Sequence, residues 1–269
     1  MSNTELFHED LESIEVDAWH DLYAAAPKEY AVENGLHSRR YENGVALVHE
    51  RLPSAEFCRI VGVRSLTELE RAVAWTRELK SNCFIQVPEK ASTQSLRDDL
   101  ALRGYKQRGN GWSKLRLTNS PSAANFPSAL SVVRVSINDA DVFGRVVQTA
   151  FGLPESTVGW FSSIVGRKNW AAFLAYWDGE PIASGAAYCN DGKAWLGIGA
   201  TCAEFRKKGA QSALLRARIA HVQALGINVI TAETGQPLAG AEDDSPSYSN
   251  CIRAGFTPVY RRINYRVDE

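Results

Sequence analysis

Apolar and polar residues in the second half of the chain form a pattern that predicts short strands joined by tight turns. Four runs rich in apolar residues are typical of strands, at residues 132–135, 170–177, 182–189 and 194–201. The pairs Asp178-Gly179 and Asp191-Gly192 separate the last three of these runs. Because Asp-Gly favours the backbone of a two-residue hairpin turn, the last three strands are expected to be antiparallel neighbours.

Helical patterns accompany these strands. The predicted helices cover residues 140–151, 155–165, 209–225 and 247–254. In the longest of them, Leu215, Ile219 and Val222 mark one apolar face. A buried strand over residues 228–234 follows that helix, and a final hairpin is expected from Phe256 onward.

The first half shows a shorter version of the same order. The predicted strands are residues 44–50, 57–63 and 83–87, and the predicted helices are residues 67–79 and 95–102. The last helix ends in Arg103-Gly104-Tyr105, and the second half has Ala254-Gly255-Phe256 at the corresponding place. In each case the glycine suits a helix cap, and about a dozen residues of strand character follow. We therefore predict a tandem duplication in which the first copy is degraded.

Residues 118–130 separate the two copies. This segment contains two prolines and several small polar residues but no charged residue, which is typical of a linker. A length of 269 residues also suits two domains of ordinary size. The sequence therefore predicts an α/β protein with one domain over residues 1–120 and a second over residues 131–269.

Composition restricts the classes of function. The 30 basic and 31 acidic residues give a net charge of -1, so neither a nucleic-acid partner nor a membrane partner is expected. The acidic N-terminus lacks the apolar core of a secretory signal, and no stretch is apolar for long enough to span a bilayer. A cytoplasmic location is therefore expected, as a monomer or a homodimer. The five cysteines and five histidines lack the spacing of a zinc site or of a disulfide framework, so no metal is expected.

The most informative stretch is a predicted strand, basic turn and helix within residues 195–215. Arg206, Lys207 and Lys208 precede Gly209, at which the helix begins. The N-terminus of a helix carries unpaired N–H groups and the positive end of the helix dipole, and both favour an anion. Since Gly209 also permits close approach of the backbone, the turn suits a pyrophosphate.

The segment Arg206-Lys207-Lys208-Gly209-Ala210-Gln211 resembles the signature of the GNAT N-acetyltransferase superfamily, Arg/Gln-x-x-Gly-x-Gly/Ala. Gln211 replaces the final small residue, and Ala203 replaces a proline that is common in the family. The segment from Ser249 to Phe256 resembles the later asparagine-bearing helix and Gly-Phe ending, so the resemblance covers about 140 residues. It implies that each half is a mixed, mostly antiparallel twisted sheet flanked by helices.

The resemblance also implies a donor, acetyl-CoA, and the residues that bind it. These are Gly199, Ala200 and Thr201 on the strand before the turn, Arg206, Lys207, Lys208, Gly209, Ala210, Gln211 and Ser212 in the turn and first helical residues, and Asn250 in the later helix. The corresponding turn of the first half has no glycine and carries Glu68 and Glu70, which would repel a pyrophosphate. One acetyl-CoA site per chain is therefore expected.

The general acid and base are less clearly marked. The resemblance implies direct attack by an amine on the thioester, which needs a base for the ammonium and an acid for the leaving thiolate. Cys251 occupies the position of the family's usual tyrosine acid, and Tyr248 and Ser249 lie nearby as substitutes. The strand over residues 194–201 carries no carboxylate, so Glu233 on the next strand is the alternative base. A buried inert thiol and a salt-bridged strand end are the structural alternatives for Cys251 and Glu233.

Four other residues invite assignment to a site. Trp160 and Phe161 resemble the segment that lines the acceptor site in the family, although at least one of them is expected to pack in the core. His49 and Arg59 of the first half are expected at a strand end and on the surface, respectively.

We therefore expect an N-acetyltransferase that transfers the acetyl group of acetyl-CoA to the amine of a small molecule. A non-catalytic acyl-CoA-binding sensor or module is the alternative, because Cys251 replaces the tyrosine and the strand lacks a carboxylate. A protein or peptide N-acetyltransferase is a third possibility. The sequence does not identify the acceptor, because acceptor choice depends on loops that vary freely on one scaffold.

Overall fold

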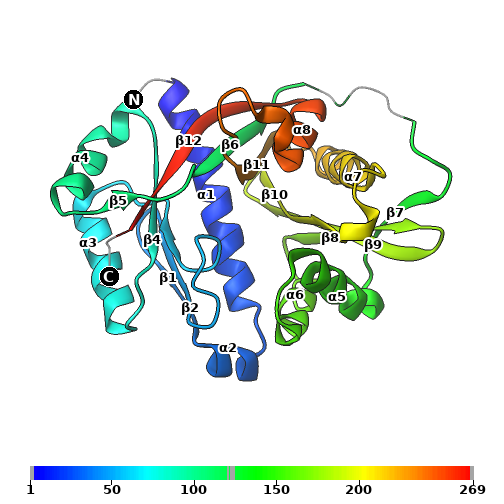
Figure 1. Ribbon diagram of the computed structural model, residues 1–269, viewed down its shortest axis with the longest axis horizontal. Helices are drawn as coiled ribbons and strands as arrows, with labels where there is room; N and C mark the ends of the chain where they lie inside the picture. Colours follow the sequence, from blue (N-terminus) through cyan, green and yellow to red (C-terminus); the bar gives the residue numbers. More distant parts are fainter. Residues whose placement is uncertain (1–2, 120, 122–124, 267–269) are drawn as a thin grey trace.

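One mixed sheet of 12 strands runs through the protein in a computed structural model that describes residues 3–119, 121 and 125–266, with side chains from residue 11 onward (Figure 1). The strands are β1 (Leu36–Arg40), β2 (Val45–His49), β3 (Arg59–Val61), β4 (Phe84–Pro88), β5 (Lys106–Gln107), β6 (Trp112–Leu117), β7 (Leu130–Arg134), β8 (Trp170–Trp177), β9 (Glu180–Asn190), β10 (Lys193–Thr201), β11 (Val229–Gly235) and β12 (Phe256–Arg266). The helices are α1 (Asn3–Ala24), α2 (Lys28–Asn34), α3 (Leu66–Glu78), α4 (Gln94–Leu102), α5 (Ala140–Phe151), α6 (Val158–Ser162), α7 (Ala210–Ala224) and α8 (Pro246–Arg253).

The strand order is β1-β2-β3-β4-β12-β6-β11-β10-β9-β8-β7, and β5 pairs with β12 beside this path. Only β3 with β4 and β10 with β11 run parallel, and the other pairs are antiparallel. Each parallel pair is joined by one crossover helix, α3 or α7, as parallel neighbours require. The predicted mixed, mostly antiparallel sheet flanked by helices is confirmed.

The two halves repeat one order of elements. The series β3-α3-β4-α4-β6 in the first half corresponds to β10-α7-β11-α8-β12 in the second. The last strand of each series is exchanged: β6 pairs with β11 of the second half, and β12 pairs with β4 of the first. The two exchanged strands also pair with each other. The two halves therefore share one continuous sheet. The predicted domain boundary at residues 120–131 does not interrupt this sheet, and the division into two domains stays a prediction.

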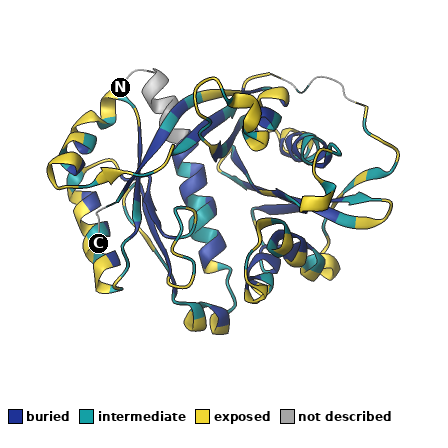
Figure 2. Cartoon of the chain, viewed as in Figure 1, coloured by how far each residue is buried: buried dark blue, intermediate teal, exposed yellow. Residues whose placement is uncertain are grey.

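Helix α1 lies between the two halves in Figure 1 and contacts strands of both. It packs on β1 and β2 of the first half and on β9, β10 and β11 of the second. Its Ile14 and Leu22 are buried in one apolar cluster with Trp160 and Trp170, and the indole nitrogen of Trp160 donates to the carbonyl of Leu22 at 2.8 Å. Figure 2 shows that α1 is mostly buried or half-buried over its described length. This helix holds the two halves together.

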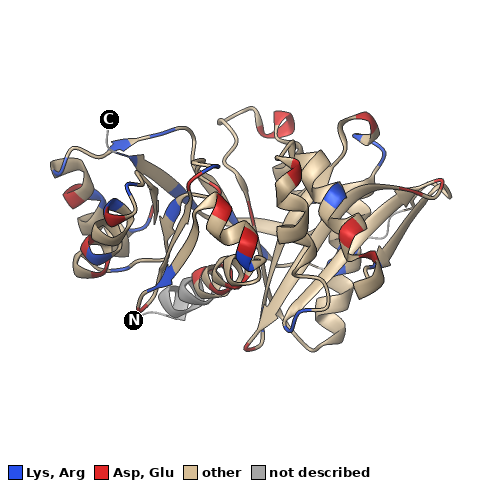
Figure 3. Cartoon of the chain, turned by 90° about the horizontal axis from the view of Figure 1, so that it is seen from below, with Lys and Arg blue, Asp and Glu red and all other residues tan. Residues whose placement is uncertain are grey.

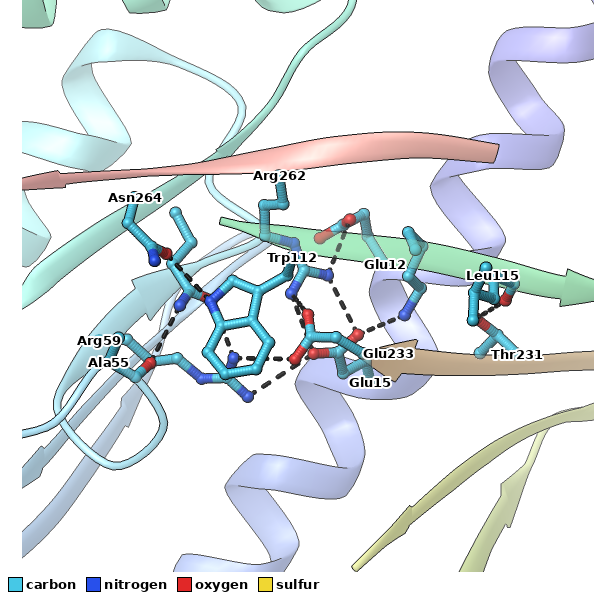
Figure 4. Close-up of polar contacts among 12 residues, drawn as sticks. Glu12, Glu15, Ala55, Arg59, Trp112, Leu115, Thr231, Glu233, Arg262 and Asn264 are labelled. Carbon is cyan, nitrogen blue, oxygen red and sulfur yellow. Dashed lines mark hydrogen bonds and ion pairs between the residues drawn. The ribbon is translucent and has the colours of Figure 1, made fainter. Parts of the chain in front are cut away.

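A cluster of six charged residues, five of them buried and Glu233 half-buried, lies where α1 crosses the centre of the sheet (Figure 4). We call it the junction charge cluster, and its members are Glu12, Glu15, Arg59, Lys114, Glu233 and Arg262. Glu15 accepts hydrogen bonds from both terminal nitrogens of Arg262, each at 3.0 Å, and forms an ion pair with Lys114. Since three carboxylates face three cations, the cluster is neutral, and ion pairs and hydrogen bonds offset part of the cost of burial.

The structure differs from the predicted elements in three parts of the chain. Helices α1 and α2 and strand β1 were not predicted. The predicted final hairpin is wrong, because residues 256–266 form the single long strand β12. That strand pairs with β6 and then β5 along one edge and with β4 along the other, and an irregularity between Pro258 and Tyr260 bends it. Both edges are therefore already occupied by strands of the first half.

The surface and the composition of the helices add little information on function. On the side seen in Figure 3, basic and acidic residues are interspersed on the helices. No helix in the described part of the chain has both the length and the apolar character needed to cross a membrane. Among the same residues, no group of three or more His, Cys, Asp or Glu side chains gathers in a way that would hold a metal ion.

Candidate active site

Strands β10 and β11 separate halfway along their length. They pair in parallel from Lys193 with Val229 to Leu196 with Ala232, and the pairing ends there. Beyond this point β10 stays with β9 through a bulge between Gly197 and Ala200, whereas β11 continues beside β6. The sheet therefore opens between the two strands beside residues 197–201 of β10.

The bulge itself has an unusual backbone. Ile198 has φ of +54°, a region that β-branched residues seldom adopt. A Cβ atom on Gly197 would lie 1.9 Å from the ring of Trp195, so only glycine fits beneath that indole. Strained backbone of this kind persists where the surroundings impose it, and it is often found at functional sites.

The side chain of Arg218, on α7, forms a hydrogen bond with the backbone of the bulge. Its guanidinium donates to the carbonyl of Gly197 at 3.1 Å and to the carbonyl of Leu214 at 3.1 Å. The side chain is 2% exposed, and burial lowers its pKa to about 10. Gly185 makes room for it, because a Cβ atom there would lie 2.7 Å from the guanidinium carbon. This role could not be predicted from the sequence, because an arginine on an amphipathic helix is ordinarily exposed.

A cavity of about 460 Å³ opens at this separation and is lined by both halves. Its walls are largely aromatic: Trp19, Phe57 and Trp112 come from the first half, and Phe151, Phe161 and Trp195 come from the second. The polar part of the wall includes Arg59, Gln211, Arg218, Glu233, Asn250 and Cys251. A mostly apolar cavity of this size with a few converging polar groups is typical of a small-molecule site.

The basic turn lies at the beginning of α7. Lys207 and Gly209 have φ of +66° and +86°, and the helix begins at Ala210. Gly209 occupies the N-cap position and has no side chain, so the first N–H groups of α7 receive no side-chain cap from it. Arg206 and Lys207 are exposed beside this helix end, whereas Lys208 lies over the rings of Trp177 and Phe205 at 4.5 and 4.8 Å. The geometry suits an anion, as the sequence predicted.

The other residues predicted to bind acetyl-CoA connect the turn to the cavity. The Gln211 side chain donates to the carbonyl of Ala200 at 2.7 Å and to the hydroxyl of Thr201 at 3.1 Å, so it fixes the end of β10. Ser212 donates to the Asn250 side chain at 3.4 Å, which connects α7 with α8. Gly199, Gln211 and Asn250 line the cavity. The structure thus brings the residues predicted to bind acetyl-CoA to one end of the opening between β10 and β11.

In the first half, a side-chain cap and a carboxylate lie at the corresponding helix end. Ser65 caps α3, and the carboxylate of Glu68 accepts hydrogen bonds from the backbone N–H groups of Asn43, Gly44 and Arg64 at 2.7, 2.9 and 3.0 Å. Burial opposes ionisation of Glu68, but these N–H groups hold its pKa below the ordinary value. The arrangement supports a single donor site in each chain.

Glu233 lies in the cavity wall and belongs to the junction charge cluster. Its two carboxylate oxygens accept hydrogen bonds from Arg59, at 3.2 Å, and from Arg262. Burial raises the pKa of Glu233 although Arg262 opposes the shift, and the negative charge of Glu15 raises it further. The structure therefore shows Glu233 as the salt-bridged strand end that was one of its two predicted roles, and its role as a base stays a prediction.

The structure separates the three candidate acids. Cys251 lines the cavity, and burial raises its pKa to about 11, so its thiol keeps its proton at neutral pH. Ser249 is buried and donates to the carbonyl of Glu242 at 2.9 Å, away from the cavity. Tyr248, which is on α8, is half-buried against the apolar core and does not belong to the cavity wall. Cys251 is the candidate that the structure places beside the opening.

The remaining candidates divide between core and cavity. Phe161 lines the cavity, whereas Trp160, also on α6, is fully buried against α1. His49 does end strand β2, but it is buried, accepts or donates with Tyr30 at 2.9 Å, and burial lowers its pKa to about 4. The expected surface position of Arg59 is wrong: it is buried, stacks on Trp19 at 4.3 Å and lines the cavity. The charges of Glu15 and Glu233, distant in the chain, make that burial tolerable.

No protein-family model matches the sequence. No match to a curated protein was found. Solved structures do resemble the chain over nearly its whole length. A tandem GNAT protein from the clavulanic acid biosynthesis pathway has a TM-score of 0.61 and 15% identity, with 95% of this chain and 94% of that chain covered.

A GCN5-related N-acetyltransferase from Sphaerobacter thermophilus has a TM-score of 0.59 and 18% identity, with coverage of 93% and 91%. A further GCN5-related N-acetyltransferase, from Kribbella flavida, has a TM-score of 0.58 and 16% identity, with coverage of 92% and 95%. The similarity extends over both halves, so the chain has the GNAT fold in a tandem arrangement.

Proposed function

We propose that this chain, with its tandem GNAT fold, is an acetyl-CoA-dependent N-acetyltransferase that acts on the amine of a small molecule. The observation that carries the proposal is the opening between β10 and β11. A basic helix end lies at one end of the opening, and a cavity with aromatic walls lies at the other. A donor and an acceptor can therefore meet at the thioester from opposite sides of the sheet.

The donor end is built mainly from backbone. The N–H groups at the beginning of α7, with Arg206 and Lys207 beside them, would hold the pyrophosphate of acetyl-CoA. The unpaired part of β10, from Gly197 to Thr201, has backbone groups that β11 does not use, and these would bind the pantetheine arm. Gln211 and Arg218 fix this part of β10 from below, so its backbone is positioned before the donor arrives.

The acceptor end favours an amine with an apolar body. The six aromatic side chains of the wall offer apolar contact, and their faces also attract a cation. The two arginines in the wall, Arg59 and Arg218, are almost completely buried. A carboxylate or phosphate on the acceptor would therefore find few cationic groups to contact. A cavity of about 460 Å³ also suits a small molecule better than a peptide chain.

Glu233 is the proposed base, directly or through a water molecule. We expect Glu233→Gln to lower kcat/KM roughly a hundredfold, because the ammonium of the acceptor would lose its proton acceptor. The carboxylate acts as a base only when ionised and its pKa is raised above 4.5, so wild-type activity should fall on the acidic side of neutrality. A pH–rate profile of both proteins measures the effect, and the acidic limb should disappear in the variant.

Glu56 provides the control for this assignment. It also lines the cavity, but at an exposed position on the rim. Glu56→Gln should keep the acidic limb and most of the activity. If Glu56→Gln removes the limb and Glu233→Gln retains it, the base has been assigned to the wrong carboxylate.

Phe57 tests the acceptor end separately from the donor end. Its ring lies in the cavity wall near Trp19 and Trp160, with centroids 6.1 and 5.7 Å away. We expect Phe57→Ala to raise KM for an apolar amine roughly tenfold, because a phenyl group contributes about 1.5–3 kcal/mol when buried. Steady-state kinetics with saturating acetyl-CoA measure this change. The Kd of acetyl-CoA should stay the same, as should both constants in the exposed control Leu102→Ala.

A non-catalytic acyl-CoA-binding module is the second candidate. It is favoured by the two arginines that hold Glu233 and by the protonated thiol of Cys251, because both restrict proton transfer. Calorimetric titration with acetyl-CoA, followed by a screen of apolar amines, distinguishes the two functions. Binding with transfer to an amine supports the enzyme, whereas binding without transfer to any amine supports the module. Absence of binding would contradict both.

A further inference from the structure

Cys58 and Cys83 are in contact although 25 residues separate them in the sequence. Their Sγ atoms lie 3.0 Å apart, and Ser81 Oγ lies 3.0 Å from the Cys58 sulfur. Each cysteine directly precedes its strand, and the next residues, Arg59 and Phe84, are register partners in the parallel pair of β3 and β4. The N–H of Phe84 donates to the carbonyl of Cys58 at 3.0 Å. Since hydrogen-bonded strands lie about 4.8 Å apart, the two backbones are within the span of a disulfide.

The pair is buried, but a small reagent can approach it. A second cavity, of about 290 Å³, is lined by Cys83 and Ser81 together with residues of α3. The Cys58 sulfur does not line this cavity but contacts both of these side chains, each at 3.0 Å. Hydrogen bonding from Cys83 lowers the pKa of Cys58 to about 7, whereas hydrogen bonding to Cys58 and burial raise the pKa of Cys83. Cys58 therefore supplies the thiolate, and Cys83 remains the protonated partner.

We propose that Cys58 and Cys83 are a dithiol modification site that forms an intramolecular disulfide when a peroxide reaches it. The Cys58 thiolate attacks one oxygen of hydrogen peroxide, which breaks the O–O bond, forms a sulfenic acid and releases hydroxide that takes up a proton. The Cys83 sulfur then attacks the Cys58 sulfur. The S–S bond forms as the S–O bond breaks, and the departing hydroxide leaves as water with the proton of Cys83. Two thiols and one peroxide thus give one disulfide and two waters.

The site is next to the acceptor cavity. Successive residues of a strand point to opposite faces of the sheet, so Cys58 lies on the side of α3 while its neighbours Phe57 and Arg59 line the cavity. Gln86 of β4 accepts a hydrogen bond from Arg59 at 2.8 Å and donates to the carbonyl of Ala55 at 2.9 Å. A covalent bond at Cys58 would fix the beginning of β3 to β4 at this wall. This consequence for the acceptor rests on the proposed function, whereas disulfide formation does not.

Mass spectrometry of the full-length protein tests the bond. The protein is treated with a small excess of hydrogen peroxide, its remaining thiols are alkylated under denaturing conditions, and it is digested without reduction. We expect a cross-linked peptide containing Cys58 and Cys83 while Cys189, Cys202 and Cys251 are still alkylated. Oxidation of any of those three first, or sulfinic acid at Cys58 without the cross-link, would overturn the proposal.

The near-isosteric variant Cys83→Ser tests the order of the steps. Without a resolving thiol, the sulfenic acid at Cys58 should persist and react with a dimedone-type trapping reagent. Absence of trapping at Cys58 would contradict its assignment as the attacking thiolate. The control Cys189→Ser should form the cross-link at the wild-type rate, because Cys189 lies outside the pair and burial raises its pKa to about 11.

Kinetics then separate the two proposals. Oxidation should change KM for an apolar amine by roughly threefold or more in the wild type and leave it unchanged in Cys58→Ser, with the Kd of acetyl-CoA constant in both. A cross-link with an unchanged KM contradicts the connection to the acceptor cavity. A cross-link in a protein that transfers no acetyl group contradicts the proposed function and leaves the modification site standing.

Discussion

Gly209→Trp is expected to abolish acetyl-CoA binding, with a rise in Kd of more than about a hundredfold. Gly209 has φ of +86°, which an L-residue adopts only with strain, and the proposed pyrophosphate site requires backbone at this position to be uncovered. An indole there would cover the N–H groups at the beginning of α7, and the loss of several charge-assisted hydrogen bonds of about 1.5–3 kcal/mol each accounts for the size of the effect. Calorimetric titration with acetyl-CoA measures it.

Gly226→Trp is the matched control, because it places the same side chain at the opposite end of the same helix. Gly226 has φ of +76°, and nothing lies within 4 Å of the position its Cβ would occupy. The two variants should therefore lose similar stability, while only Gly209→Trp loses the ligand. Full binding by Gly209→Trp would show that the cradle lies elsewhere, and equal loss in both variants would trace the effect to the fold of α7.

Glu15→Gln is expected to lower the free energy of unfolding by about 3–5 kcal/mol, the cost of breaking a buried ion pair by removing one partner. Glu15 is completely buried and contacts Arg59, Lys114 and Arg262. Without its charge, three buried cations face only the carboxylates of Glu12 and Glu233. Glutamine has almost the same shape, so the loss reflects charge rather than a cavity. Urea-induced unfolding of both proteins measures the difference.

The pH dependence of the same variant has a definite sign. Burial alone would raise the pKa of Glu15, but Arg262 and Lys114 hold it well below the ordinary value of 4.5. Its contribution is therefore complete above that pH and is lost as the pH falls through the folded-state pKa. The difference in unfolding free energy between the wild type and Glu15→Gln should be constant near neutrality and shrink in acid. A difference that grows in acid would contradict the assignment.

An exposed ion pair serves as the control. Glu42 pairs with Arg71 on the surface, with both side chains more than half exposed at 59% and 52%. Glu42→Gln should leave the unfolding transition where it is in the wild type, because solvent screens such pairs. If the two variants were equally stable, the junction charge cluster would contribute nothing beyond packing.

The order of elements in the second half could be predicted because each element there is locally encoded. Helix α5 and strand β8 begin and end at the predicted residues, because an apolar period and a following Gly or Asp-Gly mark each end. The turn at Gly209 was recognisable for the same reason, since its chemistry lies within a few consecutive residues.

The junction could not be predicted because it depends on partners far apart in the chain. Helix α1 carries Glu12 and Glu15 on a buried face, and carboxylates in a sequence ordinarily indicate solvent. Their partners, Arg59, Lys114 and Arg262, come from three different strands. Arg59 was expected on the surface for the same reason. Local patterns record neither this pairing nor the exchange of β6 with β12.

The proximity of Cys58 and Cys83 was hidden for a related reason. Their separation matches no sequence motif, and the scattered cysteines argued against disulfides. The contact arises only because α3 returns the chain to a parallel neighbour, which aligns the residues before β3 and β4. The register between two strands is a property of the assembled sheet. Residues that become neighbours through this register can therefore be recognised only in the structure.

The exchange of β6 and β12 also determines when this protein can finish folding. Strand β12 follows every other described strand in the chain, yet it separates β4 from β6 in the sheet. While the chain is being synthesised, the first half therefore has two strand edges whose partner has not yet left the ribosome. Unpaired edges invite pairing with other chains, and contacts between segments far apart in the chain form slowly. The first half must accordingly wait for β12, and a chain that lacks this strand would present both edges permanently.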